Sequence, residues 1–87
     1  MPKVCSFNVI VHNISCGEEH SCFVAGEGGF VYSMGSNNDG KLGIGDPSRK
    51  VCNVPTLVEG IYNVNKVCCG LSHSLALDQD GRAYAWG

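Results

Sequence analysis

An internal repeat constrains the fold of this chain more than any other feature of its sequence. The segment CGEEHS at positions 16–21 returns 53 residues later as CGLSHS at 69–74. Downstream, a glycine, a tyrosine and a second glycine at 29, 32 and 35 return 52 residues later, at 81, 84 and 87. The second copy is therefore one residue shorter than the first. The difference falls in a glycine-containing turn, where length changes are tolerated. A period of this length indicates an array of similar units that bury their apolar faces against one another.

The residues inside each copy predict pairs of strands. The runs 20–25 and 73–77 are short, mostly apolar and bounded by glycine and turn residues, which is typical of buried strands. After a glycine-containing turn, 29–34 and 81–86 supply a second run that carries aromatic side chains. Short links of this kind make hairpins, so each copy is expected to contain one.

The segments around each hairpin complete the unit. The approaches 8–15 and 62–68 alternate valine and isoleucine with asparagine, histidine and lysine, which suits a strand near a sheet edge. The stretch 35–49 is rich in glycine, asparagine, aspartate and serine, and we expect it to lie on the surface as a loop. No long amphipathic helix appears. Repeats of this length with about four short strands each are typical of all-β propeller blades.

Two copies in register, with a glycine-rich tail after the first, identify the repeat. The pattern x-Cys-Gly-x-x-His-Ser, followed by Gly-x-x-Tyr-x-x-Gly and by SNNDGKLGIGD at 36–46, resembles the repeat of the regulator of chromosome condensation family. The resemblance covers essentially the whole chain and implies a seven-bladed β-propeller, of which this chain holds about 1.6 blades. We assign 1–54 to the first repeat and 55–87 to a second repeat, truncated after the Trp86-Gly87 strand end.

The resemblance implies a range of functions rather than one. The founding member is a guanine-nucleotide exchange factor for the Ran GTPase on chromatin, and other members use such propellers to recruit partners in ciliary GTPase regulators, HECT-type ubiquitin ligases and kinase-linked proteins. A fold alone does not fix an activity. The segments 15–21 and 36–38 look most similar to the ciliary, retinitis pigmentosa GTPase regulator type.

We therefore expect a protein-interaction scaffold that recruits protein partners and regulates a small GTPase, and not an enzyme. The alternative is a guanine-nucleotide exchange factor for a Ran-like GTPase, an activity that would need the complete propeller. The same resemblance implies that the remaining blades, or other copies of this chain, cover the apolar faces that a partial propeller leaves open.

Composition argues against several other classes of protein. The net charge is -2, only 16% of residues are charged and no run of lysine or arginine could follow a phosphate backbone, so direct nucleic-acid binding is not expected. No apolar stretch approaches the roughly 18 residues that a membrane span needs, and no secretory signal is evident. We expect an intracellular protein, with cytoplasmic, ciliary and nuclear locations not distinguished.

Six cysteines in 87 residues raise the question of disulfides and of zinc. A disulfide framework needs an oxidising compartment, so reduced thiols are expected. Zinc ligands would come from one of two sets, but neither has the C-x-x-C pairing typical of a tetrahedral site. We expect small buried thiols and no metal or cofactor. The two sets are Cys16, His20 and Cys22, or Cys68, Cys69 and His73.

A histidine followed by a serine occurs in both copies, which raises the question of nucleophilic catalysis. An active site is made once per propeller, whereas a structural hydrogen bond recurs in every blade. Neighbouring residues of a strand also point to opposite faces, which disfavours a dyad within one copy. We expect no catalytic residue. Structural roles fall to the repeat positions Cys16, Gly17, His20, Gly29, Tyr32, Gly35, Cys69, Gly70, His73, Gly81, Tyr84 and Trp86, with the aromatic residues packing between blades.

Loops remain for binding, because neighbouring blades cover both faces of a blade. Polar residues in turns are the expected contacts with a partner. They are Asn37, Asn38, Asp39, Lys41, Asp46, Arg49 and Lys50.

Overall fold

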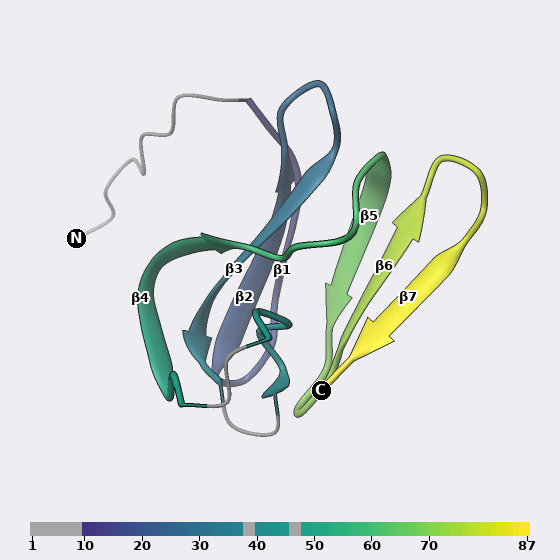
Figure 1. The fold of residues 1–87 in the computed structure, drawn as a ribbon. Coiled ribbons are helices and arrows are strands. Elements are labelled where there is room, and N and C mark those ends of the chain that lie inside the picture. Colours follow the sequence, from purple (N-terminus) through teal and green to yellow (C-terminus); the bar gives the residue numbers. More distant parts are fainter. Residues whose placement is uncertain (1–9, 38–39, 46–47) are drawn as a thin grey trace.

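The computed structural model describes residues 10–37, 40–45 and 48–87. It is all-β, with no α-helix among these residues, and its strands form two antiparallel sheets (Figure 1). The four strands of the first sheet follow chain order: β1 (Val11–Cys16), β2 (His20–Ala25), β3 (Phe30–Ser36) and β4 (Val51–Leu57). The three strands of the second sheet do the same: β5 (Val64–Cys69), β6 (Ser74–Asp78) and β7 (Ala83–Trp86).

Each sequence copy forms the predicted hairpin. In the first, β2 pairs with β3 from His20↔Gly35 to Ala25↔Phe30, and in the second β6 pairs with β7 from Ser74↔Trp86 to Leu77↔Ala83. The single-residue difference between the copies lies in the turns that close these hairpins. The predicted edge strands are confirmed as well, because β1 and β5 each begin a sheet.

The two sheets pack together through β1 and β2 on one side and β5 on the other. Valine side chains from both sheets, with Cys22 and Ala76, make one buried cluster, and Val58 joins it from the connection between the sheets. Polar side chains of β1 also hold β5. The backbone N–H of Val67 donates to Asn13 Oδ1 at 2.9 Å, and that of Cys69 donates to Ser15 Oγ at 3.0 Å. The junction between the sheets is therefore both packed and hydrogen-bonded.

β4 shows that the sheet unit and the sequence repeat are offset. This strand runs across the predicted boundary between residues 54 and 55, yet its whole length belongs to the first sheet, where it pairs with β3. The blade is therefore completed by residues that we assigned partly to the second repeat. The repeat boundaries at 1–54 and 55–87 stay a prediction.

The prediction of a buried strand holds fully for β2 but only for one face of β6. Cys22 and Val24 of β2 are completely buried, because the second sheet covers them. Leu75 and Leu77 occupy the same repeat positions in β6, and each is 42% exposed. Within the part of the chain that the structure describes, no sheet covers that face of β6.

Candidate functional site

The loop after β3 folds inward over the end of the first sheet. Asn37 organises it: its Oδ1 accepts from the backbone N–H of Leu42 at 3.3 Å, and its Nδ2 donates to the backbone oxygen of Arg49 at 2.7 Å. Ser33 Oγ of β3 donates to the Leu42 carbonyl at 2.7 Å. Lys41 is only 2% exposed, and its Nζ forms an ion pair with Glu19 Oε1 at 2.9 Å. The expectation that this stretch lies wholly on the surface is wrong.

The predicted contact residues separate accordingly. Burial of Asn37 and Lys41 contradicts their assignment as surface contacts, because their polar groups are used to build the loop. The side chains of Arg49 and Lys50 are exposed, and their role in binding stays a prediction. Three further predicted contacts, Asn38, Asp39 and Asp46, lie outside the described residues.

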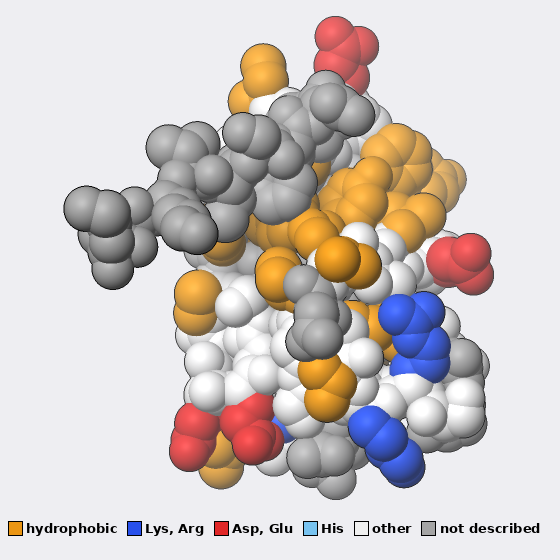
Figure 2. All heavy atoms as spheres, turned by 90° about the vertical axis from the view of Figure 1, so that its left-hand side faces the viewer, with side chains coloured by type: hydrophobic (Ala, Val, Ile, Leu, Met, Phe, Trp, Pro, Cys, Tyr) orange, Lys and Arg blue, Asp and Glu red, His pale blue; other side chains and the backbone are white. Residues whose placement is uncertain are grey.

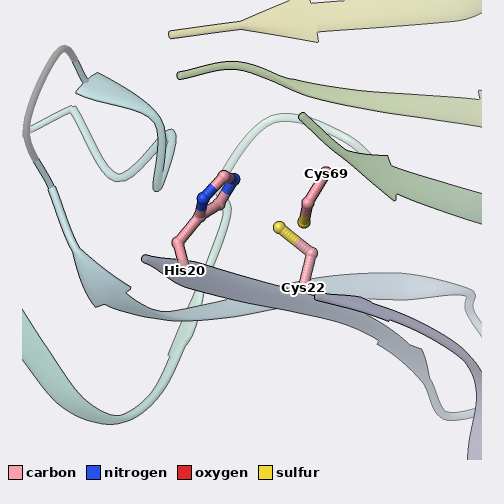
Figure 3. Close-up of side chains that lie close together, drawn as sticks. All are labelled: His20, Cys22 and Cys69. Atoms are coloured by element: carbon pink, nitrogen blue, oxygen red, sulfur yellow. The ribbon is translucent and has the colours of Figure 1, made fainter. Parts of the chain in front are cut away.

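A polar cluster lies at the junction of the two sheets (Figure 3). His20 and Cys22 are alternate residues of β2 and are both buried, so they face the second sheet together. Cys69 ends β5 and Ser74 begins β6, and these two residues are paired in register. We call His20, Cys22, Cys69 and Ser74 the junction cluster.

Ser74 connects the members of the junction cluster. Its Oγ donates to the backbone oxygen of Lys41 at 2.8 Å and lies 2.9 Å from His20 Nε2. A hydroxyl has one proton, and Ser74 donates it to the backbone carbonyl of Lys41. His20 Nε2 must therefore be the donor in its hydrogen bond with Ser74. The thiol of Cys22 lies 3.8 Å from the same oxygen. The other ring nitrogen, His20 Nδ1, is buried and has no hydrogen-bond partner among the described residues.

Burial and close packing shift the pKa values of the cluster. Burial, followed by the nearby Lys41 cation, lowers the pKa of His20 and so favours the neutral ring. The two thiols interact directly. A hydrogen bond with Cys69, together with burial, raises the pKa of Cys22. The same bond with Cys22 is the main cause that lowers the pKa of the half-buried Cys69, to about 7. Cys69 is therefore the more acidic of the two thiols.

Glycine makes room for the imidazole in both copies. A Cβ on Gly17 would lie 2.8 Å from Cε1 of His20 and 2.5 Å from the backbone oxygen of Gly70. A Cβ on Gly70 would meet Cε1 of His73 at 2.7 Å in the same way. Both contacts are closer than real Cβ atoms allow, so the glycine before each histidine is required by the close approach of the ring.

The aromatic repeat positions have different neighbours. The indole of Trp86 packs against Gly43, where an added Cβ would come within 2.6 Å of Nε1, so β7 contacts the loop of the first copy. Tyr84 packs against the core cluster and donates its hydroxyl to Asp78 Oδ2 at 3.1 Å. Tyr32 stacks on Phe23 of its own sheet, with ring centroids 5.5 Å apart.

The junction cluster joins residues that the sequence analysis had considered only within single copies. The two zinc sets each contribute, His20 and Cys22 from one and Cys69 from the other, although neither set assembles by itself. Similarly, His20 meets Ser74 of the second copy rather than its neighbour Ser21. The direction of that bond opposes nucleophilic activation, because the serine proton is held by a carbonyl and the histidine donates. Cys22 was considered only as a zinc candidate of the first copy and is not a repeat position, since Leu75 takes its place in the second copy.

The two sheets define the class of protein. Consecutive four-stranded and three-stranded antiparallel sheets, packed side by side and built from one sequence repeat, are neighbouring blades of a β-propeller. Residues 28–77 and 11–41 each match a family described as the regulator of chromosome condensation (RCC1) repeat. The chain belongs to the RCC1 repeat family.

Relatives in the human proteome match most of the chain. The X-linked retinitis pigmentosa GTPase regulator of Homo sapiens is 38% identical over 74 residues, 84% of this chain. The human regulator of chromosome condensation is 37% identical over 73 residues, also 84% of this chain. This chain spans only 7% and 17% of the lengths of these two proteins.

Solved structures share the fold. Yeast RCC1 (Prp20), determined with bound Kap60, superposes with a TM-score of 0.80 at 29% identity, covering 97% of this chain and 21% of that protein. Human WBSCR16 gives a TM-score of 0.81 at 31% identity, covering 99% of this chain and 22% of that protein. The described residues contain no helix that is long and apolar enough to cross a membrane.

Proposed function

We propose that this chain is a protein-interaction part of a propeller that regulates a small GTPase, and that it contributes no catalytic centre of its own. One human relative, the X-linked retinitis pigmentosa GTPase regulator, is by name a GTPase regulator. The structure of Prp20p of Saccharomyces cerevisiae was described with its binding properties to Gsp1p and histones. In the His20–Ser74 hydrogen bond the histidine donates, whereas a histidine that activates a serine nucleophile must accept the serine proton. This direction supports a binding role over hydrolytic catalysis.

The observation that carries the proposal is an anchored pair of basic residues on the loop. The backbone oxygens of Arg49 and Lys50 accept hydrogen bonds from Nδ2 and the backbone N–H of Asn37, at 2.7 Å and 2.8 Å. Their side chains meanwhile face solvent. Two adjacent exposed cations on a hydrogen-bonded backbone give the loop a local positive charge, which can steer and orient an acidic partner surface.

Charge reversal of this pair tests the proposal. Binding of a Ran-type GTPase, in its nucleotide-free, GDP and GTP forms, is measured by surface plasmon resonance for the parent chain and for the R49E/K50E variant. We expect the double variant to associate on the order of tenfold more slowly, with a weaker dependence on salt, because electrostatic complementarity acts mainly on the association rate. The control is K66E, at another exposed lysine, on β5. Equal losses in both variants, or no binding by the parent, would contradict the proposal.

Nucleotide exchange is the second candidate function, favoured by the similarity to the regulator of chromosome condensation. A fluorescent-nucleotide release assay on the complete propeller separates the two. Binding without faster release supports an interaction module. Faster release at substoichiometric amounts of the complete propeller would instead identify an exchange factor.

A further inference from the structure

The junction cluster brings three ligand-type side chains from two sheets to one point. One ligand atom each from His20, Cys22 and Cys69 lies within 4.8 Å of the others (Figure 3). In a tetrahedral zinc site with bonds of about 2.0 to 2.3 Å, ligand atoms lie about 3.3 to 3.8 Å apart. The cluster therefore needs to contract by only about 1 Å around an ion.

A fourth donor lies at the same point. Ser74 Oγ is 3.8 Å from Sγ of Cys22, which matches an edge of a tetrahedron of zinc ligands. It is 2.9 Å from Nε2 of His20, so these two atoms would move apart by about 0.4 Å around an ion. One nitrogen and two sulfur atoms, with a neutral oxygen, suit zinc. They do not suit magnesium or calcium, which select carboxylate and carbonyl oxygens.

Charge balance favours the ion in this buried position. Coordination releases one proton from each of the two thiols to solvent, and the resulting thiolates neutralise the two positive charges of zinc. The imidazole and the hydroxyl remain neutral. The loaded site therefore has no net charge, which removes the main cost of placing an ion among buried residues.

Coordination through Nε2 would change the tautomer of His20. The proton that Nε2 donates to Ser74 would move to Nδ1, the buried ring nitrogen that has no hydrogen-bond partner among the described residues.

We propose that the junction cluster binds one zinc ion through His20, Cys22 and Cys69, with the Ser74 hydroxyl in the fourth position. The ion would join the two sheets, because two ligands come from β2 and the others from β5 and β6. The site is specific to this junction, since the position of Cys22 is taken by Leu75 in the second copy. The proposal is independent of the GTPase-regulating function.

Zinc binding is measured on the 87-residue chain, kept reduced with a phosphine and stripped of metal with a chelator. We expect one zinc per chain by elemental analysis, and X-ray absorption at the zinc edge that shows two sulfur and two lighter donors. The thermal unfolding midpoint should rise with zinc concentration, because the ion binds only the folded arrangement. Absence of stoichiometric zinc, or a site with three or four sulfur donors, would overturn the proposal.

Serine variants assign the ligands. C22S and C69S should each weaken zinc binding at least tenfold in a chelator competition, whereas C68S should bind as the parent does. Cys68 is the matched control, since it is an exposed thiol next to Cys69 in sequence. Circular dichroism without metal checks that each variant folds.

Thiolate charge-transfer absorption of bound cobalt gives a readout that does not depend on stability. It should be lost in C22S and C69S and kept in C68S. Retention of the band by C22S or C69S, or equal zinc binding by the parent in concentrated urea, would show adventitious thiol binding and would overturn the site.

Discussion

Ser74 is completely buried and has a single hydroxyl proton for several polar neighbours. It gives that proton to the carbonyl of Lys41 and accepts from His20, so one side chain of the second sheet satisfies two groups of the first copy. Buried polar groups left without partners are costly. This serine therefore contributes to the adhesion of the sheets through polar contacts, in addition to the valine cluster.

The S74A variant tests that contribution. Removal of the hydroxyl leaves the Lys41 oxygen and His20 Nε2 unpaired, so we expect the free energy of unfolding in zinc-free buffer to fall by about 1 to 3 kcal/mol. Urea denaturation followed by circular dichroism measures the change. The control is S72A, at a half-buried serine, which should alter stability by less than about 0.5 kcal/mol. Equal stability of S74A and S72A would show that the bridge contributes nothing.

The junction cluster also marks the limit of prediction at the residue scale. The repeat singled out His20 and Cys69, because both occupy positions that recur. Their contact could not be predicted, since it depends on how one sheet is placed against the next. Cys22 and Ser74 are 52 residues apart and meet only across that junction. Sequence patterns within one copy do not indicate which residues of two copies come into contact.

At the scale of the element, hairpins were predictable and β4 was not identified. Glycines at the turns and the apolar runs beside them defined β2, β3, β6 and β7. The segment of β4 contains Pro55, which weakens a strand prediction because proline cannot donate a ladder hydrogen bond. Among the described strands, β4 lies at the edge of its sheet and pairs with β3 alone, and proline is tolerated at an edge.

The turn between β6 and β7 is held by one carboxylate. Asp78 Oδ1 accepts from the backbone N–H groups of Asp80 and Arg82 at 2.9 and 2.8 Å, and Oδ2 accepts from Tyr84. Burial alone would raise the pKa of Asp78. The hydrogen bonds from Arg82, Tyr84 and Asp80 outweigh burial, and the pKa is lowered. The hairpin thus favours the charged form of this side chain.

This lowered pKa gives the hairpin a defined acid sensitivity. Because the folded pKa lies below the unfolded value of about 3.9, the stabilisation by Asp78 is complete above that value and is lost as pH falls through the folded pKa. We expect D78N to be less stable than the parent at pH 7 and to lose less stability on acidification to below about pH 4. Urea midpoints across this range measure both effects. D80N, at an exposed neighbour, is the control, and a parallel pH profile for parent and D78N would refute the assignment.

At the scale of the whole molecule, hydrophobic side chains are exposed on more than one surface. Figure 2 shows hydrophobic side chains gathered on the side of the molecule that includes β4. Phe30, Leu57 and Tyr62 line a shallow hollow at the end of β4 and are 42%, 40% and 66% exposed. On the second sheet, Leu75 and Leu77 are also exposed. Two different uncovered surfaces permit head-to-tail contacts, which continue from copy to copy unless the rotation closes a ring.

Self-association of the isolated chain should therefore run through the open face of β6. The equivalent positions of β2, Cys22 and Val24, are completely buried by the second sheet, so the repeat itself shows that this face is built to be covered. We expect the parent chain to sediment as concentration-dependent oligomers and the L75Q/L77Q variant to shift toward monomer, because glutamine removes the apolar gain of association. V51Q, at an exposed apolar residue of β4, is the matched control and should leave the distribution nearly unchanged. A monomeric parent over the whole concentration range would contradict the prediction, whereas an equal response to V51Q would move the contact to the surface that includes β4.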